Sequence, residues 1–140
     1  GKFKKDAHFR ELFFWFLLTV MILFKTLLNR NMWMNPLSDV MGGWTLTDAK
    51  GKVSAEPVEN VIMLIPWTWL LIVLKNRKNA VKRPVLYAIA AGFLFSLTIE
   101  TLQLMLRLGT FQMSDICYNT LGGMIGGVMY WITRRIKNMV

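Results

Sequence analysis

The chain has 140 residues, a formal net charge of +9 and a hydrophobic content of 54%. A soluble domain is normally about 45–50% apolar, with charge spread over its surface, whereas the charged residues here cluster between long apolar stretches. This pattern excludes an ordinary soluble enzyme domain and a disordered basic tail. It also predicts no nucleic-acid partner, because the cations do not line one solvated face.

Four segments are long and apolar enough to cross a membrane, which takes roughly 20 largely apolar residues. They are residues 9–28, 57–74, 84–107 and 115–133. An outer loop over residues 29–56 connects the first two, and its prolines, glycines and tryptophans favour a loop at the interface over another span. We therefore predict an all-α, polytopic membrane protein: one domain over residues 1–140 with four transmembrane helices.

Basic residues are divided unevenly between the two sides of these spans. Twelve lie in the N-terminal segment, the connection between the second and third spans, and the C-terminal segment, whereas four lie on the other side. The positive-inside rule places the richer side in the cytoplasm. Both termini are thus predicted to be cytoplasmic, with the loop over residues 29–56 outside.

Polar residues inside the spans suggest a functional site, because ionisable groups in a membrane are costly and usually paired or functional. In the third and fourth spans they fall on one face of each helix, toward its outer end. With the polar start of the second span, the candidate ligand-binding residues are Asn60, Glu100, Gln103, Arg107, Asp115 and Asn119. We expect them to converge in a pocket open toward the exterior.

A purely structural interpretation of the same residues stays open. Glu100 would pair with Arg107, with Gln103 as a bridge. Asp115 would cap the N-terminus of the fourth span, a position that aspartate favours. Asn119 would make a hydrogen bond between helices, as polar residues in membrane bundles often do.

Small residues at a spacing of four predict close packing of the third and fourth spans. The stretch LGGMIGGV contains two overlapping pairs of glycines, and the third span carries small residues at the same spacing. The residues assigned to helix packing are Gly92, Ser96, Gly122, Gly123, Gly126 and Gly127. Formation of a homodimer through the same glycines stays open.

Familiar constellations of catalytic or metal-binding residues are absent from the sequence. It has one cysteine and one histidine, and it contains no Ser-His-Asp order, HExxH or CxxC motif. We therefore assign no catalytic residue, no metal ligand and no cofactor. The sequence favours a binding protein over an enzyme without excluding either.

The run SLTIETLQLMLRLGTFQMSDICYNTLGGMIGG resembles the signature of VanZ-like membrane proteins. The resemblance covers about residues 33–131, and its shared residues are Asn60, Pro66, Glu100, Gln103, Asp115, Asn119, Gly122 and Gly126, with a glycine-aromatic turn over 109–111. The family often has acids where Gln112 and Ser114 stand. If those acids form a cation site in relatives, the site is weaker or absent here.

The resemblance implies a multi-pass protein of the bacterial cytoplasmic membrane that lowers susceptibility to teicoplanin-type lipoglycopeptides. We hypothesise that the outer pocket binds an amphiphile: a lipid headgroup, a lipid-linked wall precursor or the antibiotic itself. The loop carrying Trp33 and Trp44 would form a lid. Two alternatives stay open: an enzyme that acts on a lipid-linked glycan or phosphate, with Glu100 and Asp115 as acid and base, and a scaffold for wall-synthesis machinery.

Overall fold

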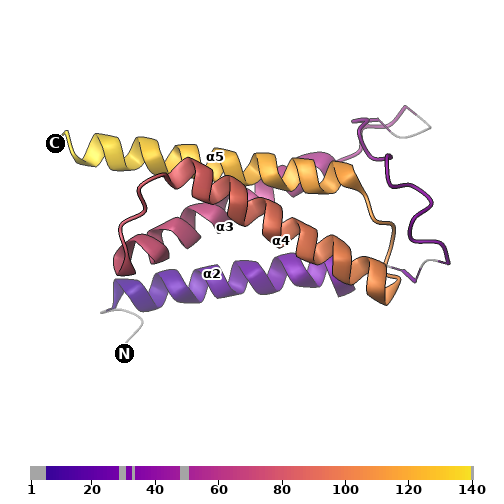
Figure 1. The fold of residues 1–140 in the computed structure, drawn as a ribbon, viewed down its shortest axis with the longest axis horizontal. Helices are drawn as coiled ribbons and strands as arrows, with labels where there is room; N and C mark the ends of the chain where they lie inside the picture. The colour runs from indigo at the N-terminus through magenta and orange to yellow at the C-terminus, as the bar shows by residue number, and fades with distance from the viewer. Residues whose placement is uncertain (1–5, 29–30, 33, 48–50, 140) are drawn as a thin grey trace.

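The structure is a computed structural model that describes residues 6–28, 31–32, 34–47 and 51–139. Its elements are α2 (Ala7–Leu23), the π-helical turn η1 (Phe24–Leu28), α3 (Glu56–Lys78), α4 (Pro84–Leu106) and α5 (Met113–Lys137) (Figure 1). The described residues contain no strand, only two isolated β-bridges. The all-α prediction is confirmed.

Local sequence explains where the helices begin and end. The carboxylate of Asp6 accepts hydrogen bonds from the backbone N–H groups of His8 and Phe9, which caps α2. Prolines in the first turns of α3 and α4 remove only donors that have no partner there. Acidic residues in the first turn of α3 and basic residues in its last turn also match the helix dipole.

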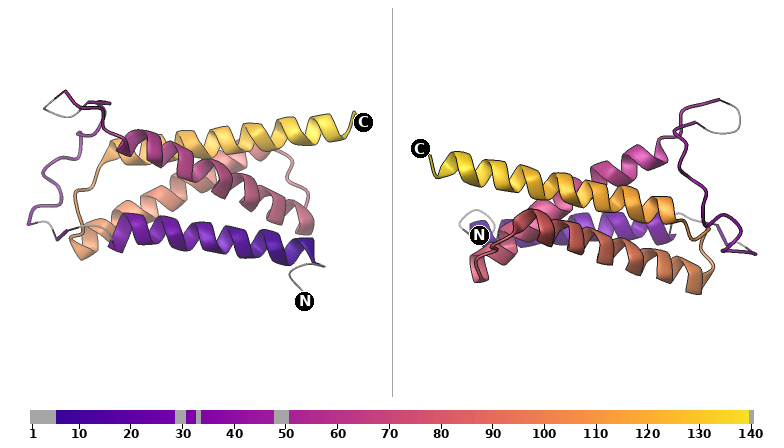
Figure 2. Two further views of the ribbon diagram at one scale, coloured as in Figure 1. Left: turned by 180° about the vertical axis from the view of Figure 1, so that it is seen from behind. Right: turned by 45° about the horizontal axis from the view of Figure 1, so that its top comes forward.

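The four helices run between two ends of an elongated bundle. The start of α2, the α3–α4 connection and the end of α5 lie at one end, as Figures 1 and 2 show. The described part of the α2–α3 loop (residues 31–32, 34–47 and 51–55) and the α4–α5 turn (residues 107–112) lie at the other. We call these the basic end and the loop end, since Lys75, Arg77, Lys78, Arg134, Arg135 and Lys137 occupy the last turns of α3 and α5.

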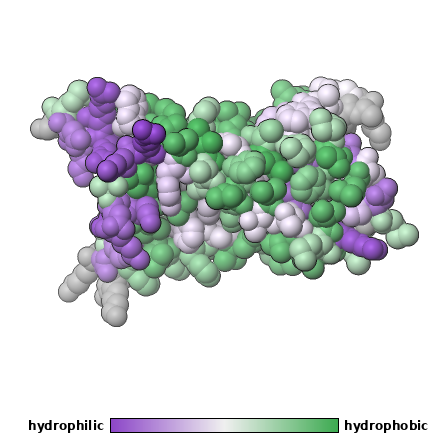
Figure 3. All heavy atoms as spheres, viewed as in Figure 1, coloured by the Kyte–Doolittle hydropathy of each residue, from purple (hydrophilic) through white to green (hydrophobic). Residues whose placement is uncertain are grey.

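Three helical segments in the described part of the chain are long and apolar enough to cross a membrane. They are residues 7–28, which combine α2 with η1, then α3 and α4. Apolar side chains gather around the middle of the visible face and hydrophilic ones at the basic end (Figure 3). The structure supports a membrane protein. The fourth span and the cytoplasmic side of the termini stay predictions.

Helix α5 packs between α3 and α4 through two different sets of glycines. A Cβ atom at Gly122 would lie 2.3 Å from the Val61 carbonyl oxygen of α3, and one at Gly126 2.1 Å from Thr68 Oγ1. A Cβ atom at Gly123 would lie 2.9 Å from the carbonyl oxygen of Ala88 in α4. Gly127 likewise faces α4.

The predicted close packing of the third and fourth spans is present, but it uses Gly123 and Gly127, whereas Gly122 and Gly126 pack against α3. Residues adjacent in a helix differ by about 100° in direction, so Gly122 and Gly126 face one neighbour while Gly123 and Gly127 face another. On α4, Gly92 lies against Gly123, because a Cβ atom at Gly92 would lie 3.3 Å from the Cα of Gly123. One glycine-rich stretch thus brings two helices close to the backbone of α5.

Aromatic packing joins α2 and α4 to α3 near the middle of the bundle. The ring of Trp67 stacks on Phe95, with centroids 4.3 Å apart, and lies 5.7 Å from the ring of Trp15. Trp67 Nε1 donates to Thr19 Oγ1 at 2.8 Å, which satisfies its polar atom inside the bundle. This cluster fixes the helices whose loop ends carry the polar residues considered next.

Candidate functional site

Five of the six predicted ligand-binding residues lie buried near the loop end of the bundle. Each is at most 6% exposed. They come from the start of α3, the last two turns of α4 and the first two turns of α5, and we call them the polar cluster: Asn60, Glu100, Gln103, Asp115 and Asn119. Three separate helices thus deliver polar groups to one level of the bundle.

Asp115 links α5 to α3. Its Oδ1 accepts a hydrogen bond from Asn60 Nδ2 at 2.9 Å, and both side chains are buried. Asp115 is the third residue of α5, where the first-turn amides favour a negative charge. The N-cap residue is Gln112, so the alternative in which Asp115 caps the helix is wrong.

Glu100 holds the turn that joins α4 to α5. Its Oε2 accepts a hydrogen bond from the backbone N–H of Gln112 at 2.9 Å, a donor at the helix start that has no partner within the helix. Glu100 is 2% exposed. The carboxylate therefore orients the start of α5 as well as lying within the polar cluster.

Gln103 and Asn119 each use the amide nitrogen and leave the oxygen buried. Gln103 Nε2 donates to the carbonyl oxygen of Thr26 at 2.6 Å, and Asn119 Nδ2 donates to Ser96 Oγ at 2.8 Å. Within the described residues, Gln103 Oε1 and Asn119 Oδ1 have no hydrogen-bond partner. Buried acceptors of this kind are uncommon in native proteins, and they are open to an N–H or O–H donor.

The π-helical turn at the end of α2 supplies the partner of Gln103. Thr26 lies in η1, where a wider helical turn frees carbonyl groups from the regular pattern. Its own hydroxyl donates to the Ile22 carbonyl at 2.7 Å. Beside it, Lys25 forms an ion pair with Glu59 at the start of α3.

The α2–α3 loop is fastened over this end of the bundle by hydrogen bonds to the α4–α5 turn and to α5. Three join backbone groups: Gly109 N to Asn31 O at 3.2 Å, Phe111 N to Pro36 O at 2.8 Å and Met113 N to Val40 O at 3.0 Å. Three others use side chains: Gln112 Nε2 to Asp39 Oδ2 at 2.7 Å, Ser114 Oγ to Gly42 O at 2.7 Å and Tyr118 OH to Trp44 O at 3.0 Å. The loop therefore forms a cover beside the polar cluster.

A glycine permits this close approach of the loop. Gly43 has a φ of 76°, a left-handed conformation that side chains disfavour. A Cβ atom there would lie 2.5 Å from Ser114 Oγ. The predicted lid residue Trp44 has its ring 6.2 Å from that of Tyr118, whereas Trp33 lies outside the described residues.

Arg107 does not join the polar cluster. It forms the C-cap of α4 with a φ of 53°, and its side chain is exposed. The predicted bridge from Glu100 through Gln103 to Arg107 is wrong, because Gln103 turns toward Thr26 and Glu100 toward the backbone of Gln112. The left-handed turn at Arg107 reverses the chain and directs its side chain away from the bundle.

Gln112 and Ser114 were singled out in the sequence only as departures from a family pattern. In the structure both fasten the α2–α3 loop with neutral side chains, and Ser114 is fully buried. Among the described residues, no group of three histidine, cysteine or acidic side chains is placed to hold a metal ion. Gln112 and Ser114 therefore hold the α2–α3 loop in place in this chain.

An all-helical bundle with three membrane-length helices and a buried polar cluster at one end defines a small helical membrane protein. The chain belongs to the VanZ/LLP1 family, whose model matches residues 5–134. Membership of this family indicates a membrane protein linked to glycopeptide resistance. The comparisons with curated proteins and with solved structures found no match.

Proposed function

We propose that this protein lowers the susceptibility of a bacterial cell to teicoplanin-type lipoglycopeptides by binding an amphiphile at the polar cluster. The observation that carries the proposal is a set of buried acceptors beneath a fastened loop. Glu100 and Asp115 contribute carboxylates, and Gln103 and Asn119 each contribute an amide oxygen without a partner among the described residues. Family membership supplies the link to glycopeptide resistance.

In this proposal the whole chain is one domain with four spans in the cytoplasmic membrane, and the loop end faces outward. Helix α5 is the fourth span. Its 25 residues reach about 37 Å at 1.5 Å per residue. Glycines and polar groups face its neighbours, and its partly exposed face is apolar, with Leu121, Met124, Val128, Met129 and Ile132. An even number of spans places both termini on the same side of the membrane, and the excess of basic residues there assigns that side to the cytoplasm.

The chemistry of the polar cluster defines the class of ligand. Carboxylates and amide oxygens accept hydrogen bonds, so they suit the hydroxyl, amide and amine groups of a headgroup or a glycopeptide. A cluster at the depth of the membrane surface, beside exposed apolar helix faces, suits a molecule that also carries an acyl chain. We propose a lipid headgroup, a lipid-linked wall precursor or the lipoglycopeptide as the ligand.

Access to the cluster requires the α2–α3 loop to move. The loop is attached to the rest of the protein largely through the α4–α5 turn and the start of α5, by hydrogen bonds that can break and re-form. Loops held by a few polar contacts open more readily than packed helices. The loop thus acts as a lid over the acceptors.

The test compares acid-to-amide variants in bacteria at equal membrane levels of protein. Glu100→Gln and Asp115→Asn keep side-chain shape but remove a charge and an acceptor, so both should reduce protection against teicoplanin toward that of cells lacking the protein. Glu59→Gln is the matched control. This acid lies at the same end but is half exposed and pairs with Lys25, so protection should persist.

Full protection by both cluster variants would remove the polar cluster from the mechanism. Equal loss in all three variants would show that charge at this end matters in general and would also contradict a specific role for the cluster. Membrane levels and unfolding midpoints measured for each variant separate loss of function from loss of the folded protein.

A further inference from the structure

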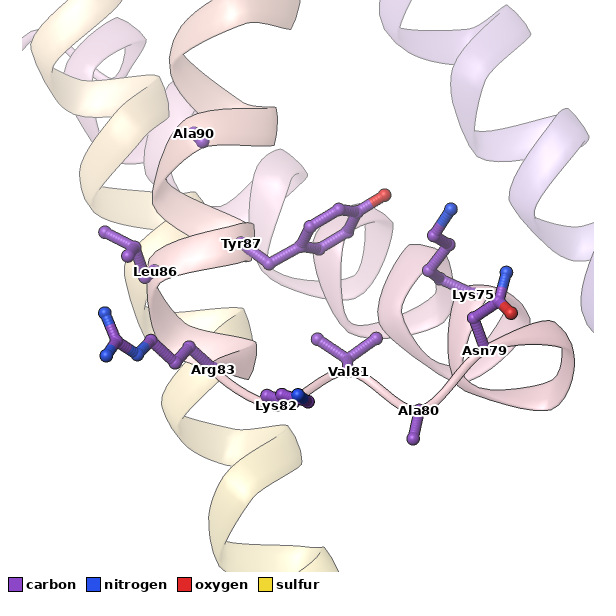
Figure 4. Close-up of a pocket in the computed structure, with 9 residues that line it drawn as sticks. All are labelled: Lys75, Asn79, Ala80, Val81, Lys82, Arg83, Leu86, Tyr87 and Ala90. Carbon is purple, nitrogen blue, oxygen red and sulfur yellow. The ribbon is translucent and has the colours of Figure 1, made fainter.

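A second feature lies at the basic end, away from the polar cluster. A cavity of about 590 Å³ opens where α3 ends and α4 begins (Figure 4). Lys75 and Asn79 lie on one flank and Arg83 and Leu86 on the other, with Tyr87 reaching between them. The residues that line it are Lys75, Asn79, Ala80, Val81, Lys82, Arg83, Leu86, Tyr87 and Ala90.

The polar groups of this cavity suit a phosphate. Its lining contains three cations, an amide and a phenol, and none of the lining residues is acidic. Arg77, close to it in sequence, is occupied by a two-pronged ion pair with Glu11, at 2.6 and 2.7 Å. The cations that line the cavity therefore remain available to an anion.

The positive charge continues around the α3–α4 connection. A neighbouring cavity of about 450 Å³ shares Lys82 and is also lined by Arg134 and Arg135 of α5. The guanidinium of Arg135 lies 5.2 Å from the centroid of the Trp131 ring, which holds a cation beside an aromatic ring suited to the membrane interface. Both cavities thus lie among interfacial residues.

The connection that forms the cavity floor is held in place. The side chain of Val81 is 9% exposed and belongs to an apolar cluster with Ile72, Ala88 and Tyr130. Its backbone N–H donates to Asn76 Oδ1 at 3.1 Å, and its carbonyl accepts from Arg134 at 3.5 Å. The basic groups are thus presented on a fixed segment, which lowers the ordering cost of binding.

An apolar cavity continues from the basic one toward the middle of the bundle. It has a volume of about 380 Å³ and shares Tyr87 and Ala90 with the basic cavity. Its other lining residues are Trp67, Ala91, Leu94, Phe95 and Thr98. The basic cavity, whose cations surround a largely apolar lining, therefore continues along α4 into a second apolar cavity.

We propose that these two cavities form a binding site for an anionic phospholipid. The headgroup phosphate binds Lys75, with the Tyr87 hydroxyl and the Asn79 amide as further donors, while Lys82 and Arg83 add positive charge at the α3–α4 connection. One acyl chain lies along the apolar cavity, between Tyr87 and Phe95. Basic pockets between membrane helices are a recurrent mode of recognising such lipids, and this site is separate from the polar cluster.

The experiment uses the purified full chain in detergent micelles and counts bound lipids by native mass spectrometry. The probes are dioleoylphosphatidylglycerol, dioleoylphosphatidylcholine, glycerol phosphate and inorganic phosphate. We expect one tightly retained phosphatidylglycerol, with phosphatidylcholine weaker by about 10-fold or more, because the site offers several cations to a net negative headgroup. Neither glycerol phosphate nor inorganic phosphate should displace the lipid.

Two variants map the site, with a control that changes the same charge. Lys82→Gln combined with Arg83→Gln should weaken phosphatidylglycerol binding about 10-fold or more. Lys78→Gln combined with Lys137→Gln removes two exposed cations from the same end that line neither cavity and should leave binding unchanged. Ala90→Leu fills the junction of the two cavities and should also weaken binding.

Three results would overturn the proposal. Equal retention of phosphatidylglycerol and phosphatidylcholine would show that charge does not select the lipid. Full displacement by inorganic phosphate or glycerol phosphate would identify an anion site without an acyl-chain component. Equal loss of binding in the Lys82 and Arg83 double variant and in the Lys78 and Lys137 control would assign the effect to total charge. All variants must first be shown to share the unfolding midpoint of the parent chain.

Discussion

Single polar residues at the loop end stabilise the bundle as well as forming the candidate site. Asn60 and Asp115 are bonded to each other at 2.9 Å across α3 and α5, while Gln103 and Asn119 keep one buried oxygen each without a partner among the described residues. A residue that served packing alone would be expected to satisfy both its polar atoms. The free oxygens therefore distinguish the site from ordinary polar contacts between helices.

The bond between Asn60 and Asp115 should be measurable as a coupling between their substitutions. We expect Asn60→Ala and Asp115→Ala each to lower the free energy of unfolding, because each removes the hydrogen bond between these two buried side chains. The double variant should lose less than the two losses added together, by about 1 kcal/mol. Unfolding in a detergent titration, followed by circular dichroism, measures this. Strictly additive losses would contradict the contact.

Sequence reasoning found the members of the polar cluster but not their partners. Helical periodicity placed the polar residues on one face of each helix, and the positions of Glu100 and Asp115 at the outer ends of their spans placed them at one depth. It could not reveal that Gln112 and Ser114 bind the α2–α3 loop, since those contacts join residues more than 70 positions apart. Arg107 was misplaced because a left-handed cap turned it outward.

At the scale of elements, α5 is the helix around which the bundle is built. Its successive glycines face two neighbours, so that α3 and α4 each approach its backbone closely. The spacing of small residues predicted a close helix contact, but it could not say how many neighbours shared the glycines. That choice depends on how the helices are arranged around α5, which no local pattern encodes.

Substitution of these glycines should have graded effects. In Gly126→Ala the new methyl group would lie 2.1 Å from Thr68 Oγ1 and 2.5 Å from the Ile65 carbonyl oxygen, so the helices must separate. We expect a loss of roughly 1–3 kcal/mol. The control is Gly92→Ala, whose nearest neighbour is 3.3 Å away, and its loss should be smaller. Thermal unfolding in detergent compares them, and an equal loss would contradict the assigned contacts.

The two ends of the bundle differ in chemistry. The loop end buries acids and amides beneath a loop, whereas the basic end presents cations around the α3–α4 connection. Charge distribution along the sequence predicted this polarity well, because it depends on composition and not on packing. By length and apolar content alone, three helical segments qualify as membrane spans and α5 does not. The less apolar, inward face of α5 is covered by its neighbours.

The transmembrane topology can be determined by labelling single cysteines with a reagent that does not cross membranes. In a Cys117→Ser background, Met34→Cys at the loop end should react in intact cells. Lys78→Cys and Lys137→Cys at the basic end should react only after the membrane is opened, because an even number of spans places both on the inner side. Reaction of Lys137→Cys in intact cells, with Lys78→Cys protected, would show that α5 does not cross.

We propose that protection against teicoplanin depends on an amphiphile reaching the polar cluster beneath the α2–α3 loop. Cysteines at Val40 and Met113, whose backbones are hydrogen-bonded at 3.0 Å, would lock this loop in a chain that carries Cys117→Ser. The most direct measurement is the teicoplanin susceptibility of cells with the lock oxidised and then reduced, beside the Val40→Cys single variant. We predict loss of protection when locked and its return on reduction. Full protection in the locked state would show that protection does not require the loop to open.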